Sequence, residues 1–207
     1  MMYILAVLLG YLIGSINPAI IISKLMGTDI REHGSGNAGA TNTYRTLGAG
    51  PALCVLAFDI IKGVIAVLIA RWIFKDTNGA DICAGFGAIM GHNFPLYFKF
   101  KGGKGVLTSF AVALVLQPWA ALAALVVGVA VIAVTKYVSL GSMVGAVVLP
   151  IATVFFGHGD ILMLAFMTVL ALFVILRHHQ NIERLMSGTE RKFGKKRVER
   201  KEEAKID

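Results

Sequence analysis

The sequence is short of charged residues and of cysteine, and these shortages exclude several classes of protein. Charged side chains make up 15% of the 207 residues, whereas hydrophobic side chains make up 57%. Together with a mean hydropathy of +0.74, that composition lies outside the range of a soluble globular domain. The two cysteines, Cys54 and Cys83, both lie within apolar runs, which is typical of small buried side chains and not of a disulfide scaffold.

Signatures of several kinds of chemistry are also missing. The five histidines form no H-E-x-x-H pattern, and no G-x-S-x-G nucleophile elbow occurs. The net charge is +8, yet the basic residues lie between and after apolar runs, and no nucleic-acid recognition module accompanies them. We therefore expect no metal, no cofactor and no nucleic-acid partner.

Long apolar runs are what the sequence does have, and several approach the ~20 residues that cross a bilayer. They predict an all-α integral membrane protein. The first run lacks a basic leader and a cleavage site, so we expect a retained helix and not a signal peptide. We expect residues 1–190 to form one polytopic membrane domain and residues 191–207 a charged cytoplasmic tail. The predicted apolar segments are residues 3–23, 51–74, 81–98, 106–134, 138–157 and 161–176.

The number of crossings depends on residues 106–134, which are interrupted by Gln117-Pro118-Trp119. One tilted crossing would place residues 99–104 and the basic tail on opposite faces, against the positive-inside bias. Two short crossings place both on the same face. We therefore predict about seven transmembrane helices, with the N-terminus outside and the C-terminus cytoplasmic. The other basic residues on that face would be Lys24, Arg31, Arg45 and Lys136.

A glycine-rich polar stretch, residues 34–42 followed by Arg45, separates the first two apolar runs. It has no apolar periodicity. Its glycines allow close approach to a ligand, its Ser, Asn and Thr side chains supply neutral hydrogen-bond partners, and Arg45 suits a phosphate or carboxylate. A plain flexible loop would not need this density of polar groups, so the stretch favours an oxyanion site.

A second glycine run, residues 102–105, opens a predicted helix and carries Lys104. Free amides at a helix N-terminus bind anions. The run is not a Walker A loop, because Gly105 stands where Ser or Thr would follow the lysine. The alternative is a lysine cluster at the membrane interface, which fits Lys99 and Lys101 better than Lys104.

Other polar residues fall at the ends of apolar runs on the same predicted face. For His92, Ser139 and Ser142, structural roles such as capping are the simpler interpretation. Asp59 and Lys62 lie three residues apart within a span, where ionisable groups usually pair towards the bundle interior. We expect that pair to be structural.

The motifs together resemble the bacterial acyl-phosphate:glycerol-3-phosphate acyltransferases of the PlsY type. Residues 34–42 with Arg45 are similar to the first signature of that family, and residues 91–95 with 100–106 are similar to the second. Residues 137–142 and 177–185 are similar to the third region. The resemblance implies transfer of a fatty acyl group from acyl phosphate to the 1-position of sn-glycerol 3-phosphate, without cofactor. A transporter of an organic phosphate or anion is the alternative, although no paired halves are found.

The resemblance also implies site residues, surroundings and partners. The protein would lie in the bacterial inner membrane with its site facing the cytoplasm, and its partners would be the two substrates, membrane lipid and the enzyme that produces acyl phosphate. Ser35 would not form an acyl-enzyme, because no oriented base accompanies it. The implied catalytic residues are Ser35, Asn37, Arg45, Lys104, His178 and Asn181. The implied substrate-binding residues are Gly34, Gly36, Gly39, Thr41, Asn42, His92, Gly102, Gly103, Gly105, Ser139 and Ser142.

Overall fold

A computed structural model describes residues 1–157 and 159–194, and within them the chain is helical without strands. The all-α prediction is thus confirmed. Most of the predicted charged tail, residues 195–207, lies outside the described residues. The helices are α1 (Met2–Gly14), α2 (Pro18–Leu25), η1 (Ile30–Glu32), α3 (Ala40–Leu47), α4 (Ala49–Ile73), α5 (Ala80–Asn93), η2 (Leu96–Phe98), α6 (Val106–Leu116), α7 (Pro118–Thr135), α8 (Val138–Phe156), α9 (Ile161–Leu176) and α10 (His179–Met186).

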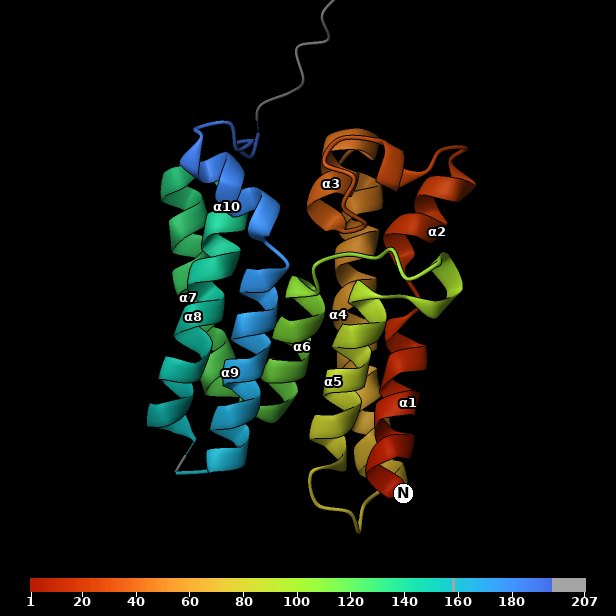
Figure 1. Ribbon diagram of the computed structural model, residues 1–207, viewed down its shortest axis with the longest axis vertical. Coiled ribbons are helices and arrows are strands. Elements are labelled where there is room, and N and C mark those ends of the chain that lie inside the picture. The colour runs from red at the N-terminus through yellow and green to blue at the C-terminus, as the bar shows by residue number, and fades with distance from the viewer. Residues whose placement is uncertain (158, 195–207) are drawn as a thin grey trace, which may run out of the picture.

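The helices form two groups that stand side by side (Figure 1). One group contains α1 to α5, in which α1 packs along α5 and α4 packs on both. The other contains α7, α8, α9 and α10, in which α7 packs along α8 and α8 on α9. Helix α6 lies between the groups and contacts α4, α5, α7 and α9. Its residue Val112 is buried in the same apolar cluster as Met167 and Leu170 of α9. The space between the groups is therefore the place where residues distant in sequence meet.

Four helical segments among the described residues are long and apolar enough to cross a membrane, or five if α9 and α10 are counted as one segment bent by 56°. The first, Met2–Leu25, joins α1 and α2. The sequence predicted one uninterrupted helix there, but the chain breaks at Ser15–Asn17. The Asn17 side chain accepts a hydrogen bond from the Ile20 amide at 3.1 Å, and Pro18 occupies the first turn of α2. Both features start a new helix, which explains the break.

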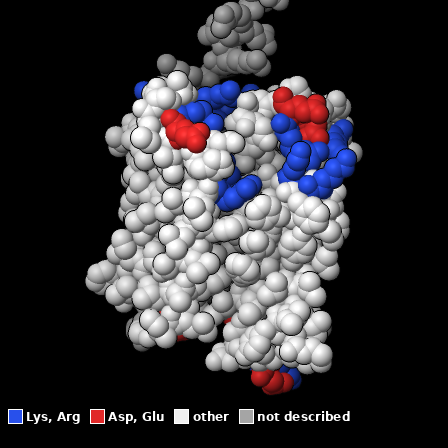
Figure 2. All heavy atoms as spheres, in the orientation of Figure 1, with Lys and Arg blue, Asp and Glu red and all other residues white. Residues whose placement is uncertain are grey.

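The chain reverses near Pro118, between α6 and α7 (Figure 1). At one end of the molecule, Arg71 from the last turn of α4 donates to the Val115 carbonyl at 3.5 Å. At the other end, the amide of Phe193 donates to the Lys136 carbonyl at 2.7 Å. Helices α6 and α7 thus run in opposite directions. Most Lys and Arg side chains consequently gather at the end that carries α2, α3 and α10 (Figure 2).

Helices α1 and α5 approach each other backbone to backbone through glycine. A Cβ atom added to Gly10 would lie 2.0 Å from the Ala84 carbonyl oxygen, and one added to Gly91 would lie 2.2 Å from the Tyr11 oxygen. Small residues allow this close packing of apolar helices. The contact fixes the C-terminal end of α5, where His92 and Asn93 begin the polar site.

Candidate active site

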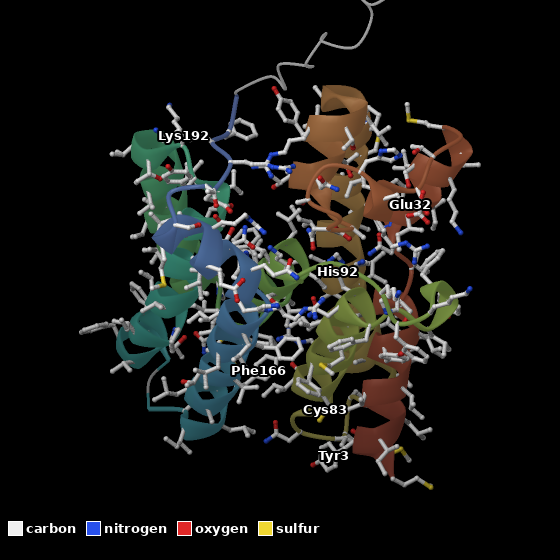
Figure 3. The ribbon with its side chains drawn as sticks, turned by 45° about the horizontal axis from the view of Figure 1, so that its top comes forward. Tyr3, Glu32, Cys83, His92, Phe166 and Lys192 are labelled. Atoms are coloured by element: carbon white, nitrogen blue, oxygen red, sulfur yellow. The ribbon has the colours of Figure 1, made fainter. Side chains whose placement is uncertain are left out.

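A cavity of about 570 Å³ lies between the two helix groups. Polar residues from four separate parts of the chain contribute to its lining, among them Ser35, His92, Ser139 and His178. Figure 3 shows His92 centrally placed, below the end that carries Glu32 and Lys192. Most of the remaining lining is apolar and comes mainly from α6, α7, α8 and α9. The cavity therefore joins a polar end to an apolar slot.

The glycine-rich stretch is held in shape by Asn42. The Asn42 side chain accepts from the amide of Ser35 at 2.8 Å and donates to the carbonyls of Ile30 and His33 at 3.1 and 3.0 Å. The side-chain amide of Asn42 is thus occupied by bonds that hold the loop. Its predicted direct role in binding substrate is not supported by this geometry. Gly34 adopts φ 61°, and a Cβ there would lie 2.2 Å from the Asn42 side-chain oxygen. Glycine is therefore required at this turn.

The remaining polar residues of this stretch face the cavity as predicted. Ser35, Asn37 and Thr41 all line it, as does Arg45. The second half of the stretch is not a loop, because α3 begins at Ala40. Sequence periodicity missed this helix because its buried residues, Asn42 and Thr43, are polar.

The second glycine run does not offer its first amides to a ligand, contrary to the prediction. The amides of Gly102 and Gly103 donate to the carbonyls of Asn93 and His92 at 3.2 and 3.1 Å. These are end carbonyls of α5, which would otherwise be unpaired. Gly103 is needed for a different reason: a Cβ there would lie 2.2 Å from Nε2 of His92.

Lys104 and the N-terminus of α6 keep their predicted places. Gly105, Val106 and Leu107 line the cavity beside Lys104, so the positive end of α6 faces it. The Lys104 ammonium donates to the side-chain oxygen of Asn181, which joins the two helix groups. Burial, with Arg184 nearby, lowers the pKa of Lys104 to about 8.

Arg45 contributes a second cation to the polar end. Its Nη2 donates to the Arg191 carbonyl at 3.1 Å. Burial lowers the pKa of Arg45 from its usual value, although an arginine remains charged at any physiological pH. Beside it, the rings of Tyr44 and Phe193 stack at 5.1 Å between centroids. The residues after α10 therefore lie against α3 at the polar end.

His178 is oriented by its own helix turn. Its Nδ1 lies 2.7 Å from the Val174 carbonyl oxygen, and a carbonyl can only accept, so Nδ1 carries the hydrogen. The opposite nitrogen, Nε2, is then a free proton acceptor in the neutral ring. His178 lines the cavity.

Glu190 is a site residue that the sequence did not predict. Its carboxylate accepts hydrogen bonds from Ser139 and Asn181, both at 2.7 Å, and from Arg184 at 2.8 Å. Burial alone would raise the pKa of Glu190, but the bond from Arg184 and the bonds from Ser139 and Asn181 bring it below its usual value. A lone carboxylate between Arg184 and Arg191 is the only sequence signal, and it does not reveal the contact with α8.

Asp59 and Lys62 form the predicted buried ion pair, with 2.8 Å between Nζ and Oδ1. His92 completes the cluster: its Nδ1 lies 2.8 Å from Nζ of Lys62 and 3.2 Å from Oδ1 of Asp59. All three side chains are at most 7% exposed. Asp59 and His92 line the cavity, whereas Lys62 lies behind them.

Together, the fold and the site define a multi-pass membrane protein with a cationic, glycine-rich pocket that opens into an apolar slot. Comparison with known sequences identifies the family. The profile of the family described as glycerol-3-phosphate acyltransferase matches residues 4–188, and the chain belongs to that family.

Relatives and solved structures agree with this assignment. The glycerol-3-phosphate acyltransferase of Thermoanaerobacter sp. (strain X514) is 46% identical over 93% of this chain and 96% of the relative. A relative of the same name from Thermus thermophilus is 43% identical over 91% and 94%. The crystal structure of PlsY, an integral membrane glycerol 3-phosphate acyltransferase, in its glycerol 3-phosphate form has a TM-score of 0.86 and 36% identity, covering 93% of this chain and 96% of that one. The form of that protein with lysophosphatidic acid gives a TM-score of 0.82.

Proposed function

We propose that this protein transfers a fatty acyl group from acyl phosphate to the 1-hydroxyl of sn-glycerol 3-phosphate, producing 1-acylglycerol 3-phosphate and phosphate. The observation that carries the proposal is the cavity, because it joins a cationic end to an apolar slot. Both substrates carry phosphate, and the donor also carries an acyl chain. The family membership favours this reaction over transport of an organic phosphate.

The polar groups divide into those that bind phosphate and those that face the reacting carbonyl. Arg45, Lys104 and the N-terminus of α6 bind phosphate oxygens. Ser35, Asn37 and Thr41 line the same cavity and donate to the second phosphate and the developing oxyanion. The remaining predicted site residues, Gly36, Gly39, Gly105, Ser139, Ser142 and Asn181, shape or flank this polar end.

The reaction needs no covalent intermediate. The hydroxyl oxygen of glycerol 3-phosphate forms a bond to the acyl carbon, the bond from that carbon to the phosphate oxygen breaks, and phosphate leaves with its electron pair. The hydroxyl proton passes to His178 Nε2 or to a substrate phosphate oxygen. Because the donor is already an activated anhydride, positioning and electrostatic stabilisation are sufficient.

The finer topology belongs to the same proposal. Seven crossings, with the N-terminus outside, would place Lys104, Lys136 and Arg177 on the cytoplasmic side of the inner membrane. An enzyme that produces acyl phosphate could then deliver it directly. Cysteine labelling at introduced sites in residues 34–45 and 188–194 tests this arrangement, and labelling of either segment from the periplasm would contradict it.

Purified protein in detergent, given acyl phosphate and radiolabelled glycerol 3-phosphate, should form labelled lysophosphatidic acid with sequential kinetics. Acyl-CoA should not replace the donor. Intact-mass spectrometry after incubation with acyl phosphate alone should show no acyl adduct. Ping-pong kinetics or an acyl group on Ser35 would refute direct transfer, and absence of product would refute the proposed reaction.

A further inference from the structure

The ammonium group of Lys62 has three close partners. It forms hydrogen bonds with Nδ1 of His92 at 2.8 Å and the carbonyl oxygen of Ile16 at 2.9 Å, and an ion pair with Oδ1 of Asp59 at 2.8 Å. An ammonium group has three N–H donors and no acceptor. Two of these donors are therefore used by hydrogen bonds, and the ion pair holds when Lys62 is charged and Asp59 is ionised.

This arrangement determines the tautomer of His92. Because Lys62 can only donate, Nδ1 of His92 must accept, and in the neutral ring the hydrogen then lies on Nε2. Nδ1 then carries no hydrogen, so its contact of 3.2 Å with Asp59 Oδ1 is not a hydrogen bond. His178 has the opposite tautomer, since its Nδ1 donates to a carbonyl.

The Nε2 atom of His92 lies where the second glycine run reaches the cavity. A Cβ on Gly103 would come within 2.2 Å of it, so only glycine leaves that nitrogen uncovered. The ring lines the cavity, and the His92 carbonyl holds the Gly103 amide at 3.1 Å. The same residue thus supports the segment that carries Lys104, and its Nε2 lies beside that segment.

We propose that Lys62 and Asp59 are positioning residues that hold His92 as a fixed Nε2–H donor to an anionic oxygen of the bound substrate. The inference rests on the proposed function only in identifying that oxygen as a phosphate oxygen of glycerol 3-phosphate. Removing the cluster frees the ring to change tautomer. Wherever the ring then carries its hydrogen on Nδ1, a lone pair faces the phosphate in place of a hydrogen.

The tautomer can be measured directly in the full-length wild-type protein. Nitrogen NMR of protein labelled with ¹⁵N-histidine distinguishes the protonated nitrogen of a neutral ring from the unprotonated one, and the His92 signals are those lost in His92→Gln. We expect an unprotonated Nδ1 and a protonated Nε2. A protonated Nδ1, or a ring protonated on both nitrogens, would overturn the proposal without reference to any variant.

Binding variants test whether the cluster acts through His92. The paired change Asp59→Asn with Lys62→Met removes both charges, so that no single charge remains buried without a partner. Calorimetric affinity for glycerol 3-phosphate, measured without acyl phosphate, should fall about tenfold, as expected for one lost hydrogen bond to a charged group. Arg71→Met with Asp81→Asn removes the ion pair at the other end of the molecule and should leave the affinity unchanged.

A mutant cycle with His92→Ala separates positioning from a general structural effect. In the His92→Ala background, the paired change should cost little more affinity, because its effect is transmitted through the missing ring. An equal tenfold loss in both backgrounds would overturn the proposal. If the protein binds glycerol 3-phosphate with the expected tautomer but forms no product from acyl phosphate, the proposed reaction fails and this inference stands.

Discussion

The two walls of the cavity each present a histidine, and the two rings are held in opposite tautomers. On the α9–α10 side, His178 donates Nδ1–H to a carbonyl of its own helix, which leaves Nε2 as an acceptor. On the α5 side, His92 accepts at Nδ1 from Lys62, which leaves Nε2 as a donor. The comparison teaches that one residue type can supply a hydrogen-bond acceptor and a hydrogen-bond donor in one cavity, because the partner of Nδ1 determines what Nε2 can do.

Substitution of His178, the histidine whose Nε2 is an acceptor, should have the largest effect on turnover. We expect His178→Ala to lower kcat about a hundredfold, within the range for loss of a general base, with little change in KM for glycerol 3-phosphate. Steady-state kinetics of the purified variant test this, with His179→Ala, an exposed neighbour, as the control. A loss below about fivefold would show that a substrate oxygen takes the proton instead.

Arg45, on the other side of the cavity from His178, should act by binding phosphate. Arg45→Ala is expected to lower kcat/KM for glycerol 3-phosphate by more than tenfold, because a charge-assisted contact to phosphate is lost. Lys101→Ala removes an equal charge from an exposed position and should change kcat/KM less than twofold. Equal losses in the two variants would mean that Arg45 acts only through long-range charge.

The pH dependence of the affinity for glycerol 3-phosphate should test the role of Lys104. Lys104 is cationic below its pKa of about 8 and neutral above it, so affinity for glycerol 3-phosphate should be constant near pH 7 and fall up to about tenfold by pH 9. The phosphate is fully ionised over most of this range, because its second pKa is about 6. Calorimetric titrations measure the fall, and in Lys104→Arg it should disappear. A flat profile in the wild-type protein would contradict the assignment.

The smallest effect is expected outside the cavity. Asp29 pairs with Arg31 at 2.6 Å, and the bond from Arg31 lowers the pKa of Asp29 to about 2. The carboxylate contributes stability above its unfolded pKa and loses it as the pH falls through the folded value. Since the pair is partly exposed, Asp29→Asn should cost less than about 1 kcal/mol at pH 7 and leave kcat unchanged. Thermal unfolding at pH 7 measures this, and a larger cost would mean that Arg31, which also donates to the Phe98 carbonyl, orders the loop through Asp29.

The sequence predicted the elements whose physical cause is local. Apolar length identified α4, α8 and α9, and the proline at 118 identified the reversal between α6 and α7. The positive-inside bias then placed the polar segments together, and the cavity lining confirms that they meet.

What the sequence could not predict depends on contacts made after folding. Nothing local shows that the Gly102 and Gly103 amides cap α5, because that bond requires the 94–101 segment to fold back. Asn42 was predicted to bind substrate, because its hydrogen bond with the loop backbone forms only after the turn has folded and is not visible in the sequence. Glu190 contacts Ser139 from 51 residues away, a distance that no periodicity spans.

The close contact of α1 with α5 makes the polar end of the cavity sensitive to methyl groups added far from it. An added Cβ at Gly10 or Gly14 would lie 2.0 Å from a carbonyl oxygen of α5, so α5 would have to move. Its last residues, His92 and Asn93, would carry that movement to Lys104. Temperature-sensitive alleles are therefore expected at these two glycines, which touch no substrate, and permissive-temperature kinetics would show them as affinity defects before the protein unfolds.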